Sequence, residues 1–192
     1  PFKKPDDLPP LVLAHRNPWF PMDRECALRT CGADRPALEP TGDPIEDMVK
    51  ELECAKSYGI DVIATEQGLG ARDGHFSIMA SLLEAADRVG GIRVCPMLGN
   101  TMTGGYDALK EEIRIIFERF ADHQSFLKVD GKPVFTVYIL RAYEPARWQQ
   151  LLRELEAEGY EGVFLANVYH SPRRSDLEWI LSYLTRFDGF FR

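Results

Sequence analysis

Short apolar runs alternate with longer amphipathic segments along most of the chain. The apolar runs predict strands at residues 11–14, 60–65, 92–98, 133–140, 162–166 and 187–191. Segments with apolar residues at helical spacing lie between them, at 44–58, 76–89, 106–121, 145–158 and 175–184. Short, nearly continuous apolar strands are typical of parallel sheets covered by helices. The pattern predicts a parallel α/β fold in which a strand-helix unit repeats about five times.

Local signals support several of these boundaries. Asp43-Pro44 places a cap residue and a proline where the first helix should begin, and Gly59 should end that helix. Asp130-Gly131 predicts a turn before the strand at 133–140, and Pro96 is expected near the exit of its strand. The polar stretches Lys110-Glu111-Glu112 and Arg153-Glu154 are predicted as solvated helix surface, and Trp148 as core.

Two parallel architectures compete for this pattern. A doubly wound nucleotide-binding sheet would carry a glycine-rich turn after its first strand, but the sequence there is HRNPW, followed by a long loop at about 18–42. A TIM-type (β/α)8 barrel is therefore favoured, with residues 1–192 as one domain. Because a sixth strand lacks its helix, we expect a barrel cut short after about the sixth strand. A chain ending there would self-associate through its open edges.

Composition narrows the classes of partner. The 192 residues are 45% hydrophobic and 28% charged, as expected for one globular domain. The net charge is −7 and basic residues are scattered, which argues against a nucleic-acid partner. No apolar run is long enough to predict a membrane span. Extracellular, periplasmic and cytoplasmic locations all stay open.

The cysteines and other ligand-type residues predict no metal or cofactor. Cys26 and Cys31 are either a small disulfide or two free thiols, while Cys54 and Cys95 are expected to be small buried hydrophobes. Asp73 and His75 lie close together, but two ligands in a loop fit a solvated turn better than a metal site.

In a parallel barrel the carboxyl ends of the strands meet at one face, where active sites form. The residues at these positions are His15, Trp19, Glu66, Asn100, Tyr138, Asn167, Tyr169 and His170.

Three segments carry a family resemblance. Residues 126–138 (FLKVDGKPVFTVY), 160–166 (YEGVFLA) and 187–191 (FDGFF) resemble glycoside hydrolase family 99, whose members are endo-acting α-mannosidases and α-mannanases on a (β/α)8 barrel. Residues 12–15 (VLAH) and 59–61 (GID) are also similar to the α-1,3-glucanases of family 71. The resemblance implies an oligosaccharide or polysaccharide substrate and metal-independent cleavage by two carboxylic acids.

The resemblance places the catalytic glutamates of family 99 downstream of residue 192, so no catalytic residue is carried over. Family 99 tends to have aromatic residues after the first two strands. Trp19 matches the first, whereas Glu66 departs from the second and leaves the sugar open.

The resemblance gives the strand-end residues roles in sugar binding, each beside a plainer alternative. Glu66 is a ligand for sugar hydroxyls, a candidate acid-base residue, or a rim charge paired with an arginine. Cleavage of a glycosidic bond needs two carboxyl groups roughly 5–10 Å apart, and only one such group is evident among the strand-end residues. Tyr138 stacks on a sugar or belongs to the core. His15 bonds a hydroxyl or is a satisfied histidine, and Trp19 is a platform or a packing lid.

At least one of Asn167, Tyr169 and His170 should also face the cleft.

The sequence thus predicts a glycoside hydrolase acting on α-mannan or α-glucan, in which this portion supplies scaffold and sugar subsites but is itself inactive. A noncatalytic glycan-binding or assembly protein on the same scaffold is the alternative. A metal-dependent hydrolase is a further option, which the lack of a His-x-His after the first strand disfavours.

Overall fold

The computed structural model describes residues 11–16, 41–67, 73–98, 105–138, 140–167 and 187–191. Within them, strands and helices alternate as the sequence pattern predicts. The elements are β1 (Leu13–Arg16), α3 (Pro44–Ser57), β2 (Val62–Gln67), α4 (Asp73–Val89), β3 (Arg93–Leu98), α5 (Gly105–Phe120), β4 (Lys128–Val129), β5 (Lys132–Val137), a 3-10 turn (Leu140–Ala142), α6 (Pro145–Ala157), β6 (Val163–Asn167) and β7 (Gly189–Phe191).

The strands form one sheet in which chain order equals spatial order. Its path is β1-β2-β3-β5-β6-β7, every pair along it is parallel, and β4 adds an antiparallel hairpin to β5. A doubly wound sheet would reverse its strand order at a switch point. Each new strand instead joins the same side of the sheet, which is how a (β/α)8 barrel is built. The predicted parallel α/β fold of the barrel type is confirmed.

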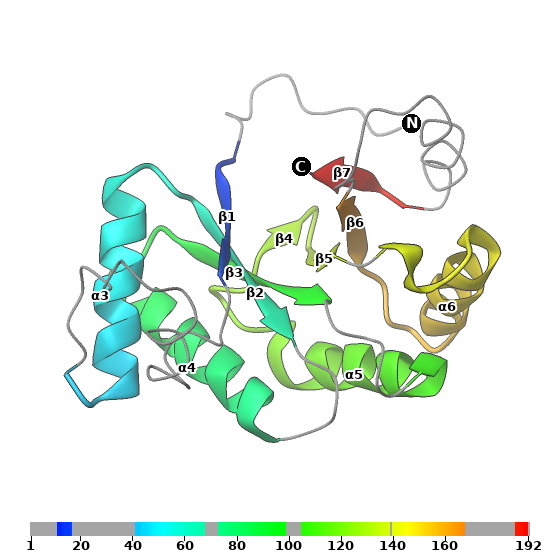
Figure 1. Cartoon of the computed structure of the whole chain (residues 1–192), viewed down its shortest axis with the longest axis horizontal. Helices are drawn as coiled ribbons and strands as arrows, with labels where there is room; N and C mark the ends of the chain where they lie inside the picture. The colour runs from blue at the N-terminus through cyan, green and yellow to red at the C-terminus, as the bar shows by residue number, and fades with distance from the viewer. Residues whose placement is uncertain are drawn as a thin grey trace, which may run out of the picture.

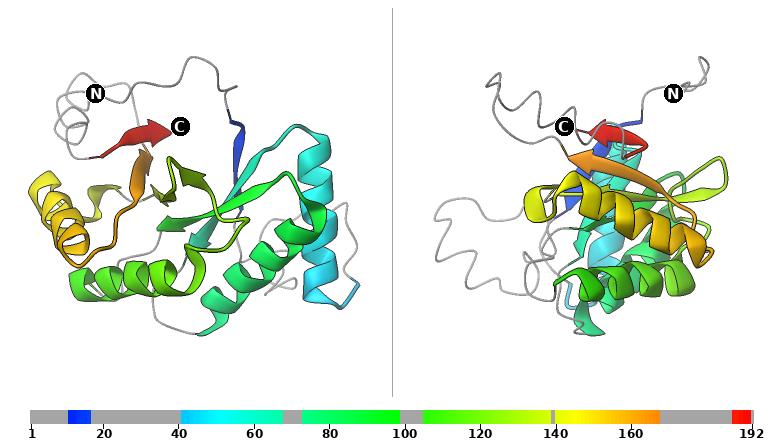
Figure 2. Two further views of the ribbon diagram at one scale, coloured as in Figure 1. Left: turned by 180° about the vertical axis from the view of Figure 1, so that it is seen from behind. Right: turned by 90° about the vertical axis from the view of Figure 1, so that its right-hand side faces the viewer.

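The helices lie outside the curve of the strands. Figure 1 shows α3, α4, α5 and α6 following one another around the sheet, and the view from behind in Figure 2 shows the same arc. The side view in Figure 2 shows α5 next to α6, and these helices are linked by the ion pair Lys110 Nζ to Glu154 Oε2, 2.7 Å long.

Alternate residues of the strands lie in two apolar layers. The larger layer packs between sheet and helices and includes Ile63, Val94, Phe135 and the fully buried Trp148, as predicted for core. The smaller layer lies on the opposite side of the sheet, which we call the inner face. Its buried members are Val62, Ala64, Cys95, Met97, Leu127 and Val134. This two-sided burial explains the nearly continuous apolar strands.

Two turn signals in the sequence act as predicted. The Asp43 carboxylate accepts hydrogen bonds from the backbone N–H groups of Ile45 (2.9 Å) and Glu46 (3.3 Å), so it caps the first turn of α3. Asp130 and Gly131 both have positive φ, 52° and 79°, which closes the tight hairpin between β4 and β5.

The first strand lies two residues later than predicted. β1 covers Leu13–Arg16 because His15 and Arg16 pair with Ala64 and Thr65 of β2. The apolar residues Leu11 and Val12 are 58% and 50% exposed. Apolarity alone therefore misplaced this strand, whose register is set by pairing with β2.

Pro96 lies near the exit of β3, as predicted, two residues before the strand ends at Leu98. Its backbone faces β5, and its carbonyl accepts a hydrogen bond from the Thr136 hydroxyl at 3.0 Å. Regular pairing between β3 and β5 begins only at Met97 with Thr136. The missing N–H of proline therefore costs no ladder bond there, so the strand continues through it.

Some predicted surface residues are not solvated. Glu112 is 8% exposed and lies with the apolar face of α5, whereas Glu111 beside it is exposed. Lys110 and Glu154 are partly buried in the ion pair between α5 and α6. Cys95 is buried as predicted, but Cys54 is exposed on α3, which corrects the expectation for that residue.

Several predictions fall outside the described residues. These are the loop at 18–42 up to residue 40, Cys26 and Cys31, and the helix at 175–184. In the described part of the chain, no helix has the length and apolarity needed to cross a membrane.

Candidate functional site

The rings of His15 and Tyr138 come together although they belong to strands that are not neighbours. His15 lies in β1, Tyr138 directly follows β5, and β2 and β3 lie between these strands in the sheet. In a flat sheet three strand spacings would separate them by about 14 Å. The ring centroids are 6.0 Å apart with an interplanar angle of 35°. The sheet therefore curls around its inner face and brings the carboxyl ends of β1 and β5 to one site.

The backbone fixes Tyr138 at the end of β5. Its N–H donates to the carbonyl of Leu98, the last residue of β3, at 3.0 Å. The side chain is 40% exposed. Tyr138 is therefore a partly exposed aromatic ring at the strand ends and not a core residue.

Glu66 reaches the same face from β2. It is two residues beyond Ala64, an inner-face residue that pairs with His15, and it pairs with inner-face Met97 of β3. Glu66 is half-buried, and this burial raises the pKa of its carboxyl group above the ordinary value. Glu66 thus keeps its proton to a higher pH than a solvated glutamate, and when protonated it can donate one hydrogen bond as well as accept others.

His15 supplies a neutral imidazole. Desolvation by the surrounding protein lowers its pKa, although part of the side chain stays exposed. A neutral imidazole offers one N–H donor and one nitrogen acceptor. The site therefore combines a phenol, an imidazole and a carboxyl group, all suited to hydrogen bonding with hydroxyl groups.

The other candidates are only partly placed. Asn167 is the last residue of β6 and pairs with Phe191 of β7, so its backbone lies at a strand end as expected. Trp19, Asn100, Tyr169 and His170 lie outside the described residues. The structure thus brings His15 and Tyr138 together and places Glu66 on the same face of the neighbouring strand β2.

Sequence reasoning missed two buried polar residues on the opposite, helix-covered side of the sheet. Arg16 is 7% exposed, and its Nε donates to Glu51 Oε1 of α3 at 2.8 Å. Its register partner is Thr65, whose side chain is fully buried. Arg16 Nη1 and Thr65 Oγ1 both lack a hydrogen-bond partner in the described part of the chain. The only sequence signal was an arginine two residues after an apolar run.

The described residues contain no group of three histidine, cysteine, aspartate or glutamate side chains that could hold a metal ion. Asp73, predicted to lie in a solvated turn, instead begins α4 and is followed in that helix by His75.

Two solved structures with a similar arrangement of strands are glycoside hydrolases. An endo-α-mannosidase of glycoside hydrolase family 99 from Bacteroides thetaiotaomicron, in complex with bis-tris propane, matches with a TM-score of 0.62 and 25% sequence identity over 77% of this chain. A second structure, also titled a family 99 endo-α-mannosidase from that organism, matches with a TM-score of 0.63 and 24% identity over 79% of this chain. The fold is glycoside hydrolase-like.

The match covers 45% and 44% of the two solved chains, so this chain spans less than half of their length. No protein-family model matches the sequence, and no curated protein sequence matches it.

Proposed function

We propose that this chain forms the sugar-binding part of a glycoside hydrolase that acts on α-linked mannan or glucan. The observation that carries the proposal is the meeting of His15 and Tyr138 across the curled sheet, with Glu66 on the strand beside His15. Strand ends at this face of a parallel barrel hold the active site in characterised enzymes. The glycoside hydrolase-like fold supports the same assignment.

Each of the three side chains has a role that suits a sugar. The Tyr138 ring offers an apolar face to pyranose C–H groups while its hydroxyl stays free to hydrogen-bond. His15, being neutral, donates to one hydroxyl and accepts from another. Glu66 accepts hydrogen bonds from hydroxyl groups when ionised and donates one when protonated.

Cleavage of a glycosidic bond requires a second carboxyl group. One carboxylic acid protonates the leaving oxygen and the other attacks the sugar or activates water, across a gap of roughly 5–10 Å. Among His15, Glu66 and Tyr138, Glu66 is the one carboxylic acid. We therefore assign His15, Glu66 and Tyr138 to sugar binding and assign catalysis to a pair of carboxylic acids outside these three residues.

Calorimetric titration of the full-length protein with α-mannan and α-1,3-glucan oligosaccharides tests this proposal. Tyr138→Ala should weaken binding about tenfold or more, because it removes the ring and its hydroxyl. Tyr138→Phe should keep most of the affinity, since the ring stays. Tyr58→Ala is the matched control, because Tyr58 is 82% exposed and follows α3 at the opposite end of the strands.

Equal affinities in Tyr138→Ala and the unaltered protein would overturn the proposed site. Binding that Tyr138→Ala weakens, without release of reducing sugar by the unaltered protein, would favour the noncatalytic glycan-binding alternative. Preference for one of the two oligosaccharides would identify the sugar that the site binds.

A further inference from the structure

A pocket lies at the other end of the strands from His15, Glu66 and Tyr138. It has a volume of about 350 Å³ and is formed by the end of α5, the hairpin between β4 and β5, and the connection from α6 to β6. Its lining residues Lys132 and Glu161 lie at or before the start of β5 and β6, whereas Tyr138 follows the end of β5. A volume of this size is at the lower end of the range for small-ligand sites.

The apolar wall of this pocket is an ordered aromatic cluster. Phe117 of α5 packs against Phe135 and Tyr160, with ring centroids 4.8 and 5.3 Å away. Gly162 makes room for this ring, because a Cβ atom there would lie 3.0 Å from Phe117 and 3.1 Å from the Pro133 carbonyl oxygen. The pocket therefore has a fixed hydrocarbon surface rather than mobile side chains.

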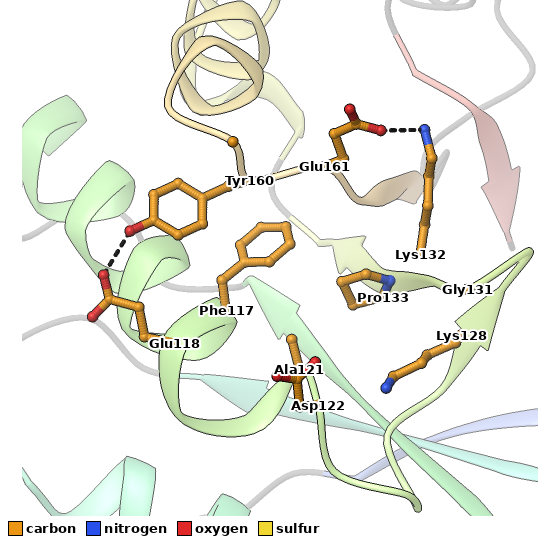
Figure 3. Close-up of a pocket in the computed structure, with 11 residues that line it drawn as sticks. Phe117, Glu118, Ala121, Asp122, Lys128, Gly131, Lys132, Pro133, Tyr160 and Glu161 are labelled. Atoms are coloured by element: carbon orange, nitrogen blue, oxygen red, sulfur yellow. Dashed lines mark hydrogen bonds and ion pairs between the residues drawn. The ribbon is translucent and has the colours of Figure 1, made fainter.

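Two contacts hold polar groups in place around that surface. The Tyr160 hydroxyl donates to Glu118 Oε1 at 2.6 Å, and Lys132 Nζ pairs with Glu161 Oε2 at 2.7 Å, as Figure 3 shows. Each contact uses one carboxylate oxygen and leaves the other able to accept further hydrogen bonds. The walls thus present oriented acceptors whose positions are already set.

A free donor and a free acceptor complete the pocket. Lys128 and Asp122 are both exposed, and the described residues provide no ion-pair partner for either. In Figure 3 the amine of Lys128 is directed toward the side of the pocket that holds Asp122. A ligand between them would have to accept from an ammonium group and donate to a carboxylate.

The charges of the lining residues disfavour simple ions as ligands. The carboxylates of Glu118, Asp122 and Glu161 disfavour an anion, and the ammonium groups of Lys128 and Lys132 disfavour a cation. A neutral polyhydroxylated molecule suits both the carboxylates and the ammonium groups, since each hydroxyl group donates one hydrogen bond and accepts others. Its C–H groups would pack on the wall formed by Phe117 and Pro133.

We infer that this pocket binds one sugar unit of an oligosaccharide as a site separate from the one at the carboxyl ends of the strands. The choice of an α-linked sugar rests on the proposed function, whereas the choice of a neutral polyol rests on the pocket alone. A second site of this kind would hold one part of a long polysaccharide chain while a distant part occupies the first site. Linking two weak sites raises the overall affinity for a long chain.

Amide NMR of the full-length protein titrated with methyl α-mannopyranoside and methyl α-glucopyranoside tests the inference. Saturable shifts are expected at the backbone amides of Lys128, Gly131 and Tyr160. Asp122→Ala and Lys128→Ala should each weaken this binding about tenfold, and both residues are exposed, so folding should be unaffected. Lys50→Ala, an exposed lysine on α3, is the control and should change nothing.

Failure of this site and failure of the first site give different results. Unshifted amides around the pocket, or shifts that persist in Asp122→Ala and Lys128→Ala, would overturn the second site alone. Tighter binding of arginine amide or inorganic phosphate than of either glycoside would overturn the assignment of a neutral ligand. Shifts at the pocket without shifts at Glu66 and Tyr138 would uphold the second site and reject the proposed function.

Discussion

The burial and the charge state of Glu112 differ from what its neighbours in the sequence indicate. It follows Lys110 and Glu111 and looks like helix surface, yet it is 8% exposed among the apolar residues of α5. Burial raises the pKa of its carboxyl group from 4.5 to about 8. At neutral pH Glu112 is therefore protonated and uncharged.

This titration makes stability depend on pH. Between pH 4.5 and about 8 the folded state holds a proton on Glu112 that the unfolded chain has lost, so the free energy of unfolding falls as pH rises through this window. Glu112→Gln should remove that slope. The variant should be more stable than the unaltered protein at pH 9 by on the order of 2–4 kcal/mol and nearly equal to it at pH 5.

Urea unfolding at pH 5, 7 and 9 measures this effect. Glu111→Gln is the control, because Glu111 is exposed one residue away and its replacement should leave the slope unchanged. A Glu112→Gln variant with the same pH dependence as the unaltered protein would contradict the buried, protonated state.

Residue types at strand ends could be predicted from the sequence, but their contacts could not. His15, Glu66 and Tyr138 were selected because each lies where an apolar run gives way to polar residues. Their meeting depends on the curl of the sheet, which no local pattern encodes. Arg16 and Glu112 were missed for a related reason, since packing against other elements buries them and neighbouring residues in sequence give no sign of it.

Among the elements, α3 and α6 differ in how they begin. Both start with proline, at Pro44 and Pro145, but only Asp43 makes side-chain hydrogen bonds to its helix, while Glu144 makes none. Asp43→Ala should lower the free energy of unfolding by about 1 kcal/mol because two backbone N–H groups lose their acceptor. Glu144→Ala, at the equivalent position of α6, should change it by less than about 0.5 kcal/mol.

Thermal unfolding of both variants provides the comparison. Asp43→Ala should melt a few degrees lower than the unaltered protein, and Glu144→Ala should melt at nearly the same temperature. Equal melting temperatures for the two variants would show that the Asp43 hydrogen bonds contribute nothing net to the stability of α3.

The types of the elements were predictable because the spacing of apolar residues agreed with the cap, turn and glycine signals at most element boundaries. Asp43-Pro44 and Gly59 fixed α3 closely, and Asp130-Gly131 fixed the hairpin before β5. β1 shifted by two residues because its ends are set by pairing with β2. Pro96 lies near the exit of β3 as predicted, and regular pairing of β3 with β5 begins only after it.

For the whole molecule, the decisive feature is that spatial strand order follows chain order. The sheet runs β1-β2-β3-β5-β6-β7 and curls, so side chains of separate strands converge on its inner face. In the described residues the outer edges of β1 and β7 pair with no further strand. Self-association through these edges stays a prediction, because unpaired edges favour added strands.

The crystal structure of the full-length protein with a bound α-mannan oligosaccharide, and in parallel with an α-1,3-glucan oligosaccharide, would show whether a sugar binds at His15, Glu66 and Tyr138. We predict a sugar ring within about 4 Å of the Tyr138 ring, with Glu66 or His15 at hydrogen-bonding distance from its hydroxyl groups. A sugar bound without contact to any of these three residues would contradict the account.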